Sequence, residues 1–373
     1  MPQKTYSARP VLTVNLRALT GNYLLMKKLA APARVAACVK ANAYGLGLEQ
    51  VGRALYGVGC RIFFVAQAQE GAALRKAIGR KSSIYVLSGP TPYDRDMLFG
   101  QSLKPVINSL AQARLWQKTV AGVKHPPRTA LHFDTGMNRL GLAPEEVKAF
   151  LSDKTLLAAL DVDLVMSHLA CAPDPAHELN AQQLSRFKNI AGRLPPLPMS
   201  LANSGGVFLG RDYHFKLVRP GIALYGGQAT LSDGQKNIRP VANLSAPVLQ
   251  VRHVRAGQGI GYNAAFIAPS DMRLAILSLG YADGLPTTLS GTNEQIKIYA
   301  RLAGKRVPVV GRISMDTTIV DITHLKTEVS PGDKAFFLGR DLTALAKAAG
   351  LIDYEILTGL GARCRRVYVT DEP

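Results

Sequence analysis

The regular alternation of short apolar runs with amphipathic stretches over about the first 220 residues is the strongest constraint on the fold. Segments with helical periodicity, such as residues 48–59, 109–122 and 177–193, separate the runs, and Ser109 is the expected N-cap of the second segment. The apolar runs cover residues 34–39, 62–66, 84–87, 104–107, 129–133, 163–168, 198–203 and 214–219. This alternation predicts parallel βα units with right-handed crossovers. Eight such units favour an α/β fold with an N-terminal (β/α)8 TIM barrel over an open doubly wound sheet.

The pattern changes after residue 240. Short β-branched runs broken by Gly and Pro predict a mostly β C-terminal domain with antiparallel strands, and helical periodicity returns only at residues 341–351. Expected strands lie in residues 244–254, 272–279, 294–300, 305–311 and 316–322. The turn-rich residues 228–240 are the expected connector. We therefore expect a barrel domain in residues 1–240, whose first 12 or so residues could join the β domain, and a β domain in residues 241–373.

A net charge of +19 on 373 residues raises the alternative of a nucleic-acid binder. The basic residues are scattered, however, and the densest cluster, residues 363–368, is short. We expect a solvated basic surface that favours small anionic ligands, with no nucleic-acid partner.

Neither a membrane nor a metal is indicated. No apolar stretch approaches the roughly 20 residues of a membrane span, and the N-terminal residues lack the apolar core of a signal peptide, so a cytoplasmic location is expected. The cysteines are far apart and lack metal-ligand spacing, so we expect them to be reduced and predict no metal site. They are Cys38, Cys60, Cys171 and Cys364.

Polar side chains follow five of the eight predicted barrel strands. In a TIM barrel the carboxyl ends of the strands form the active site, so these residues are expected to share one site. They are Lys40 after the first strand, Asp134, Asn138 and Arg139 after the fifth, His168 after the sixth, Asn203 and Ser204 after the seventh, and Arg219 with Gly221 after the eighth.

The residue types indicate the chemistry. A partly desolvated lysine at a strand end forms Schiff bases with carbonyls. The segments Asn203–Gly206 and Arg219–Ile222 offer glycine-flanked backbone N–H groups that suit a phosphate. Together they fit pyridoxal 5′-phosphate (PLP), and they equally fit an aldolase acting on a phosphorylated sugar.

Eight sequence blocks, in order along nearly the whole chain, resemble those of the bacterial alanine racemases. They are VKANAYGLG (39–47), DTGMNRLG (134–141), NSGG (203–206), RPGIALYG (219–226), GYNAAF (261–266), LGYADG (279–284), GRISMD (311–316) and DYEILTGLGARCRRVY (353–368). The resemblance implies a PLP-dependent isomerase that interconverts L- and D-alanine for peptidoglycan. It also implies a homodimer in which the β domain contributes to the partner's active site.

The resemblance also implies roles for individual residues. Lys40 would bind PLP covalently and act as base on one face of the substrate Cα, and Tyr262 of the other subunit would act on the opposite face. Because the ordinary pKa of tyrosine is about 10, positive charge from a His168–Arg219 pair would have to lower it. Arg219 would face the pyridine nitrogen of PLP. Further PLP-binding residues would be Tyr44, His168, Asn203, Ser204, Gly221, Ile222 and Tyr354, and substrate-binding residues would be Arg139, Met315 and Tyr281.

Two positions depart from the family pattern. Leu46 stands where many members have histidine, at a position not expected to touch the chemistry. His132 stands where many members have a carbamylated lysine that pairs with the substrate-binding arginine. Arg139 is then oriented either by another group or by an anion such as chloride, of which we expect the anion.

Four alternatives remain open on the sequence. One is a PLP-dependent racemase of another amino acid, such as serine or lysine. A PLP-dependent decarboxylase would need an acid at the ring nitrogen, which Arg219 disfavours. A non-catalytic PLP-binding protein would lack the β domain and Tyr262. A nucleic-acid binder would depend on net charge alone.

Overall fold

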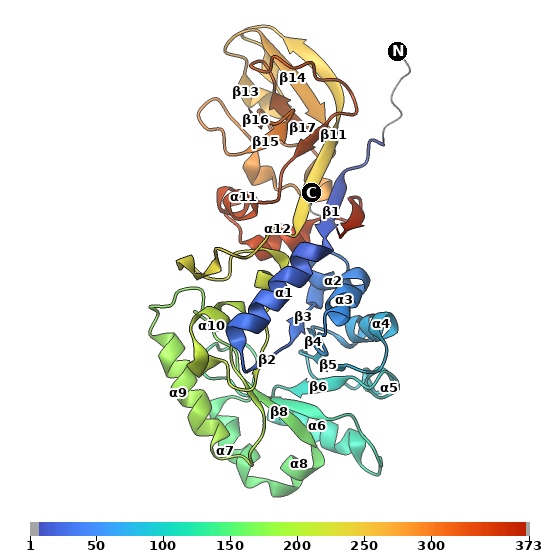
Figure 1. Ribbon diagram of the computed structural model, residues 1–373, viewed down its shortest axis with the longest axis vertical. Helices are drawn as coiled ribbons and strands as arrows, with labels where there is room; N and C mark the ends of the chain where they lie inside the picture. The colour runs from blue at the N-terminus through green and yellow to red at the C-terminus, as the bar shows by residue number, and fades with distance from the viewer. Residues whose placement is uncertain (1–6, 371–373) are drawn as a thin grey trace. The chain divides into compact units, whose positions relative to one another are not determined.

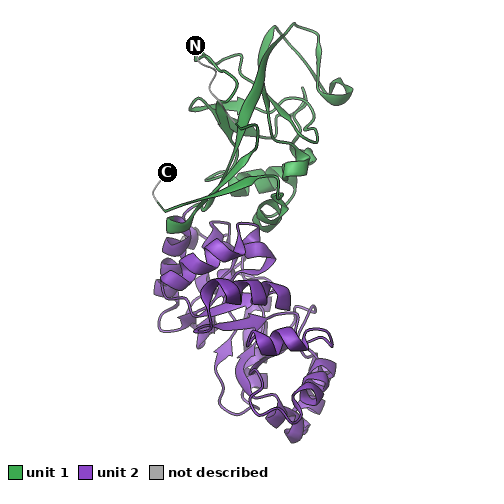
Figure 2. Ribbon diagram, turned by 90° about the vertical axis from the view of Figure 1, so that its right-hand side faces the viewer, with its two compact units in different colours: residues 1–17, 240–373 green, residues 18–239 purple. Residues whose placement is uncertain are grey.

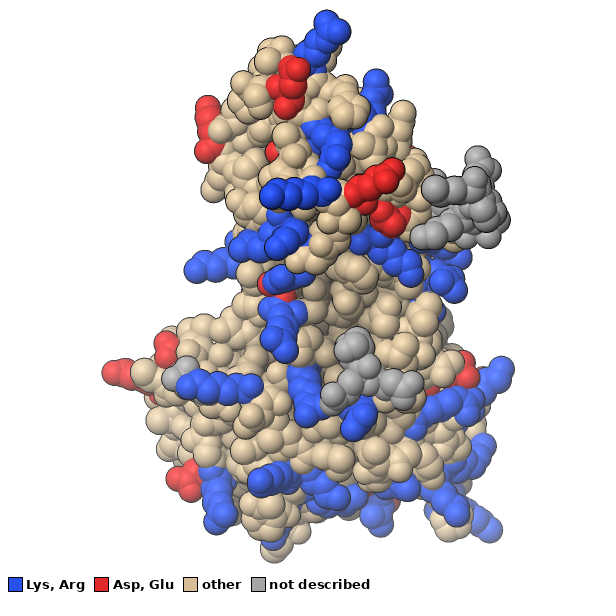
Figure 3. Space-filling view, turned by 45° about the horizontal axis from the view of Figure 1, so that its top comes forward, with Lys and Arg blue, Asp and Glu red and all other residues tan. Residues whose placement is uncertain are grey.

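The computed structural model describes residues 7–370. Contacts divide the chain into two compact units, residues 1–17 with 240–373 (unit 1) and residues 18–239 (unit 2), as Figure 2 colours them. The outer ends of the two predicted domains, residues 1–6 and 371–373, lie outside the described residues. No helix within residues 7–370 has the length and apolar character to span a membrane. Lys and Arg are spread widely over the face shown in Figure 3.

Unit 2 is a closed parallel barrel, as predicted. Its strands are β2 (Arg34–Val35), β3 (Ala37–Cys38), β4 (Ile62–Val65), β5 (Ser83–Val86), β6 (Lys104–Ile107), β7 (Thr129–His132), β8 (Val162–Met166), β9 (Met199–Ser200) and β10 (Leu217–Val218). Strands β3 to β9 form one parallel sheet in chain order, and β10 pairs in parallel with β2. The ring closes because Lys216 N donates to Met199 O (3.2 Å) and Ala36 N donates to Val218 O (2.9 Å). Since β2 and β3 are consecutive pieces of the first strand, the barrel has the eight strands expected from the sequence.

Helices surround this sheet (Figure 1). They are α1 (Leu16–Ala30), α2 (Lys40–Tyr44), α3 (Leu48–Gly57), α4 (Ala68–Ile78), α5 (Arg95–Gly100), α6 (Leu110–Val120), α7 (Pro144–Ser152), α8 (Lys154–Ala159), α9 (Leu179–Ala191) and α10 (Ser204–Phe208). The three helical segments expected from the sequence correspond to α3, α6 and α9. Ser109 caps α6 as predicted, because its hydroxyl accepts a hydrogen bond from Gln112 N (3.1 Å).

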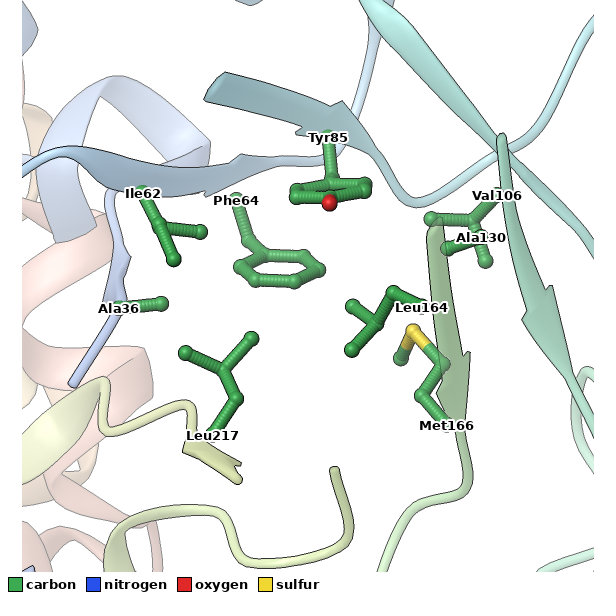
Figure 4. Packing of buried hydrophobic residues seen from close by; sticks show 9 residues of the cluster. All are labelled: Ala36, Ile62, Phe64, Tyr85, Val106, Ala130, Leu164, Met166 and Leu217. Atoms are coloured by element: carbon green, nitrogen blue, oxygen red, sulfur yellow. The ribbon is translucent and has the colours of Figure 1, made fainter. Parts of the chain in front are cut away.

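The barrel interior is filled by side chains rather than open. Phe64 on β4 stacks on Tyr85 on β5, with ring centroids 4.9 Å apart. Figure 4 shows these rings among the inward-pointing side chains Ala36, Ile62, Val106, Ala130, Leu164, Met166 and Leu217. Because this core leaves no room for a ligand, chemistry in unit 2 is confined to the loops at the strand ends.

Unit 1 is mostly β. Its strands are β1 (Val11–Asn15), β11 (Ala242–Val254), β12 (Gly259–Ile260), β13 (Phe266–Ile267), β14 (Met272–Leu277), β15 (Tyr299–Leu302), β16 (Lys305–Pro308), β17 (Thr318–Asp321), β18 (Lys334–Phe336) and β19 (Arg365–Val369). The β1–β19 pair is parallel, and the other pairs are antiparallel. Beyond residue 240, the described α-helices are α11 (Leu342–Ala349), which was expected, and α12 (Asp353–Gly359), which was not.

One expected strand is shorter than predicted. Residues 294–300 were expected to be extended, but β15 begins only at Tyr299. A turn occupies the preceding segment, since Thr292 N donates to Gln295 O (3.0 Å) and Lys297 Nζ donates to Thr288 O (2.7 Å). The Thr292–Gln295 bond occupies two backbone groups that sheet pairing would otherwise use.

Candidate active site

Lys40 stands at the start of an unusual left-handed turn. One residue, Val39, separates it from the end of β3. The next four residues, 41–44, all have φ between 52° and 55°. For non-glycine residues this conformation costs roughly 1–2 kcal/mol each. Contacts outside the turn hold it in place, because Ala41 N donates to the Glu70 carboxylate (2.6 Å) and Leu48 N donates to Asn42 Oδ1 (2.8 Å). The position of the half-buried lysine is therefore set by a backbone conformation that contacts with the rest of the barrel stabilise.

Tyr44 closes this turn against the loop after β10. Its buried ring stacks on Tyr225 with centroids 4.5 Å apart, and Tyr225 Oη donates to Cys38 O (2.8 Å). A Cβ at Gly221 would lie 2.1 Å from Tyr44 Oη, so a side chain there would displace the phenol. Gly221 thus leaves space for the tyrosine hydroxyl beside the loop.

Asn203 and Ser204 hold the loops after β9 and β10 together. The Asn203 carboxamide caps α10 by accepting from Gly206 N (3.0 Å), and its Nδ2 donates to Leu169 O (3.2 Å). The buried Ser204 hydroxyl accepts from Gly221 N (2.8 Å) and from Ala223 N (3.2 Å). Two glycine-flanked segments that the sequence suggested for a phosphate are therefore adjacent, and Ile222 lies between the two N–H donors.

Arg219 is buried at the carboxyl end of the barrel. Only 3% of its surface is exposed, and burial lowers its pKa to about 10, so it remains a cation at neutral pH. Its guanidinium donates to Ser167 O (2.6 Å) and to the Ser200 hydroxyl, and it lies above the Phe64 ring. Nη2 also donates to His168 Nδ1 at 3.5 Å.

That contact defines the state of His168. Burial, followed by the charge of Arg219, lowers the His168 pKa well below its usual value, so the ring is neutral at neutral pH. Because Nδ1 accepts from the arginine, Nε2 carries the ring hydrogen and is a donor.

Arg139 lies in a tightly organised loop after β7. The Asp134 carboxylate accepts from the N–H groups of Gly136 (2.8 Å), Met137 (2.9 Å) and Asn138 (2.9 Å). Leu142 N donates to His132 O (2.7 Å), which closes the loop at its base. Burial and the charge of Arg219 lower the pKa values of His132 and His168, and the exposed Arg139 acts in the same direction.

Three predicted site residues of unit 1 line one open groove of about 700 Å³. They are Tyr262, Tyr281 and Met315, which are 68%, 44% and 52% exposed. Tyr281 N donates to Ser314 O and Ala282 N donates to Met315 O, both at 3.0 Å, so the two loops are paired. Tyr354, on α12, is 38% exposed.

Sequence reasoning missed several residues that hold the site. Tyr225, Asn108, Glu70, Ser167 and Ser200 all support predicted site residues through hydrogen bonds or stacking. Asn108 carried a usable signal, because it directly follows the fourth apolar run. Glu70 carried none, since it lies within the first turn of a helix where an acidic residue is ordinary.

The domain comparisons agree with this arrangement. Residues 14–229 match the family described as alanine racemase, N-terminal domain, and residues 241–368 match alanine racemase, C-terminal domain. The chain belongs to the alanine racemase family.

Relatives in this family match over almost the whole chain. A catabolic alanine racemase of Agrobacterium fabrum is 43% identical over 96% of this chain and 92% of its own. A biosynthetic alanine racemase of the same organism is also 43% identical, over 96% and 93%. The crystal structure of alanine racemase from Bartonella henselae, with covalently bound pyridoxal phosphate, is 36% identical with a TM-score of 0.91 and covers 97% of this chain and 100% of that one. The biosynthetic alanine racemase from Pseudomonas aeruginosa is 32% identical, with a TM-score of 0.87 and coverage of 97% and 100%.

Proposed function

We propose that this chain is a PLP-dependent isomerase that interconverts L-alanine and D-alanine. The observation that carries the proposal is that Lys40 and Arg219 follow neighbouring strands, β3 and β10, at one end of the barrel. Cys38 N donates to Pro220 O (3.0 Å), so the strand that ends in Lys40 and the segment that begins with Arg219 are hydrogen-bonded neighbours. The family match over both domains supports the same function.

The residues at the barrel mouth fit PLP. A primary amine, a buried cation and a glycine-lined loop suit an aldehyde, a pyridine nitrogen and a phosphate respectively. Gly221 has no side chain, so the Tyr44 hydroxyl lies directly beside the loop backbone, and the Ser204 hydroxyl accepts from Gly221 N. Lys40 would hold the cofactor covalently. Tyr44, Ser204 and the backbone of Gly221 and Ile222 would hold its phosphate, with Asn203 fixing the loop and Tyr354 as a further proposed contact. When bound, PLP supplies the electron sink that acidifies the substrate Cα–H.

Arg219 would tune this sink. A guanidinium has only donors and keeps its charge, so it can bind an unprotonated pyridine nitrogen but cannot hold it protonated as a carboxylate would. Four protein acceptors fix the orientation of Arg219 at the end of the barrel core: the Ser200 hydroxyl, Ser167 O, His168 Nδ1 and Leu201 O. The expected consequence is a weaker sink and fewer side reactions such as transamination.

Inversion at the Cα needs a base on each face, because a proton removed and returned on one face restores the same enantiomer. Lys40 would serve one face and Tyr262 of the partner subunit the other. The neutral His168, with its Nε2 hydrogen, would donate to that tyrosine oxygen, and Arg219 would hold the imidazole through Nδ1. Arg139 and the Met315 backbone would bind the substrate carboxylate, and Tyr281 would line the entrance. A homodimer with shared sites is part of this proposal.

Supply of D-alanine for peptidoglycan is the proposed role, and a cytoplasmic location stays a prediction.

The proposed activity is tested by an absorbance scan of purified protein with borohydride trapping, followed by racemisation assays with alanine, serine and lysine. Alanine as the preferred substrate supports the proposal, whereas preference for serine or lysine would select the alternative racemase. A chain that binds PLP without turnover would be a non-catalytic PLP-binding protein. Rescue of a D-alanine auxotroph tests the cellular role.

A further inference from the structure

The hydrogen bonds around Asn108 determine which ring nitrogen of His132 carries the hydrogen. Asn108 Nδ2 donates to Leu87 O (2.9 Å) and to Val106 O (3.0 Å), and carbonyl oxygens only accept. Oδ1 of the same amide therefore faces His132 Nδ1, at 2.8 Å. Since Oδ1 has no hydrogen, Nδ1 of His132 must be the donor.

The remaining nitrogen of His132 is then an acceptor. The ring is 7% exposed, and burial, followed by the charge of Arg219, lowers its pKa to about 3, with Arg139 acting in the same direction and Asp134 against it. His168 is the other titratable group close enough to interact with it. The neutral ring leaves a lone pair on Nε2, and no hydrogen bond reaches this atom from residues 7–370. Nε2 is not among the fully buried atoms that lack a partner, so it keeps some exposed surface and a donor can reach it.

Arg139 is the donor that the site offers. Its guanidinium has five N–H groups and no acceptor. It stands in the loop that leaves β7 at His132 and returns at Leu142, and its charge acts on the His132 ring. Arg219, the other nearby cation, already donates to Ser167, Ser200 and His168.

Building on the proposed racemase function, we propose that His132 is a positioning residue for Arg139. In the holoenzyme, Nε2 of His132 would accept a hydrogen bond from the Arg139 guanidinium and orient it toward the substrate carboxylate. The bond from His132 Nδ1 to Asn108 Oδ1 keeps the ring in the required tautomer. This assigns to a neutral imidazole the orienting task that many relatives give to a carbamylated lysine. It also replaces the anion expected from the sequence, because a chloride next to Nε2 would face a lone pair rather than a donor.

The first test needs no turnover. Holoenzyme labelled with 15N-histidine is examined by NMR, with His132→Asn used to assign the His132 ring signals. The expected result is a neutral Nδ1–H ring that does not titrate as the pH is lowered from neutral to about 5, below the ordinary histidine pKa of about 6.5. An Nε2–H tautomer or an imidazolium would overturn the proposal, even if the enzyme racemises alanine normally.

The second test compares two isosteric variants. His132→Asn keeps a donor for Asn108 but has no atom at the Nε2 position, whereas His132→Gln places an amide oxygen there. We expect His132→Asn to raise the KM for alanine roughly tenfold with a much smaller change in kcat, since it loses a hydrogen bond to a charged group. His132→Gln should stay within about threefold of the wild-type KM.

Equal KM values for the two variants would contradict the assignment, as would a wild-type KM that falls when chloride replaces a bulky anion at constant ionic strength. Wild-type racemisation, measured in parallel, reports separately on the proposed function. If that activity is absent while the tautomer is as expected, the racemase proposal fails and the ring assignment stands.

Discussion

The two places where predicted site residues gather differ in how their side chains are held. At the barrel mouth, Arg219, Ser204 and Tyr44 are 3%, 3% and 5% exposed and fixed by neighbours from several strands. In the groove of unit 1, Tyr262, Tyr281 and Met315 are about half exposed or more. Large apolar side chains grouped at an open groove usually mark a binding surface. The residues at the barrel mouth are thus held by neighbours within the chain, whereas the groove residues form an exposed surface suited to binding.

The largest effect on racemisation is expected from a substitution at the barrel mouth, at Lys40. Lys40→Ala removes the amine that would bind PLP, so racemisation and the visible absorbance of covalently bound cofactor should both be lost. Borohydride treatment followed by mass spectrometry measures the covalent label. A Lys27→Ala variant, altered at a lysine in the last turn of α1, is the control. Label retained in Lys40→Ala would show that another lysine holds the cofactor.

Mixing two inactive variants tests whether the groove completes a second chain's site. Lys40→Ala and Tyr262→Phe are unfolded and refolded together, so that roughly half the dimers are mixed. If sites are shared, one site in each mixed dimer has neither substitution, and activity should return to roughly one quarter of wild type. The control is the Lys40→Ala variant unfolded and refolded alone, without the Tyr262→Phe variant. Activity that stays at the level of the single variants would mean that both residues come from one chain.

A smaller effect on racemisation is expected when the positive charge at position 219 is replaced by a negative one. Arg219→Glu places a carboxylate where a guanidinium donates to Ser167 O, and it should hold the pyridine nitrogen protonated. We expect slower racemisation, more transamination, and a new visible absorbance band on adding alanine. Arg219→Lys, which keeps the charge, is the matched control. An unchanged product ratio in Arg219→Glu would show that this residue does not face the ring.

The smallest expected effect concerns stability rather than activity. Burial lowers the His132 pKa to about 3 in the folded protein, so the unfolded chain binds more protons at this residue between about pH 6.5 and 3. The contribution of His132 to stability is therefore expected to decrease as the pH falls through this range. At about pH 5 the loss from this residue should reach about 2 kcal/mol. Denaturant unfolding of wild type and His132→Gln at neutral and acidic pH measures it. Equal losses in both proteins would show that His132 is not the group responsible.

The sequence predicted the barrel well because each strand is a short apolar run, and five of the eight runs are followed by the polar residues assigned to the site. Lys40, His168 and Arg219 each directly follow or end such a run. The supporting residues escaped prediction because their contacts are distant along the chain. Tyr225 bonds to a residue 187 positions away, and the Asn108–His132 bond joins two different strand ends 24 positions apart. Periodicity reports on one element at a time, so it cannot identify such pairs.

The left-handed turn after Lys40 has a consequence for how this segment can vary. Its first three residues are Ala, Asn and Ala, and none has a branched Cβ. A valine or isoleucine at position 41 or 43 would meet the steric limits of positive φ without touching any ligand. We expect a saturation library over 41–43 to recover mainly Ala, Asn, Asp and Gly. The choice of residues at 41–43 would then be restricted by the backbone conformation alone, although the segment lies next to the proposed catalytic lysine.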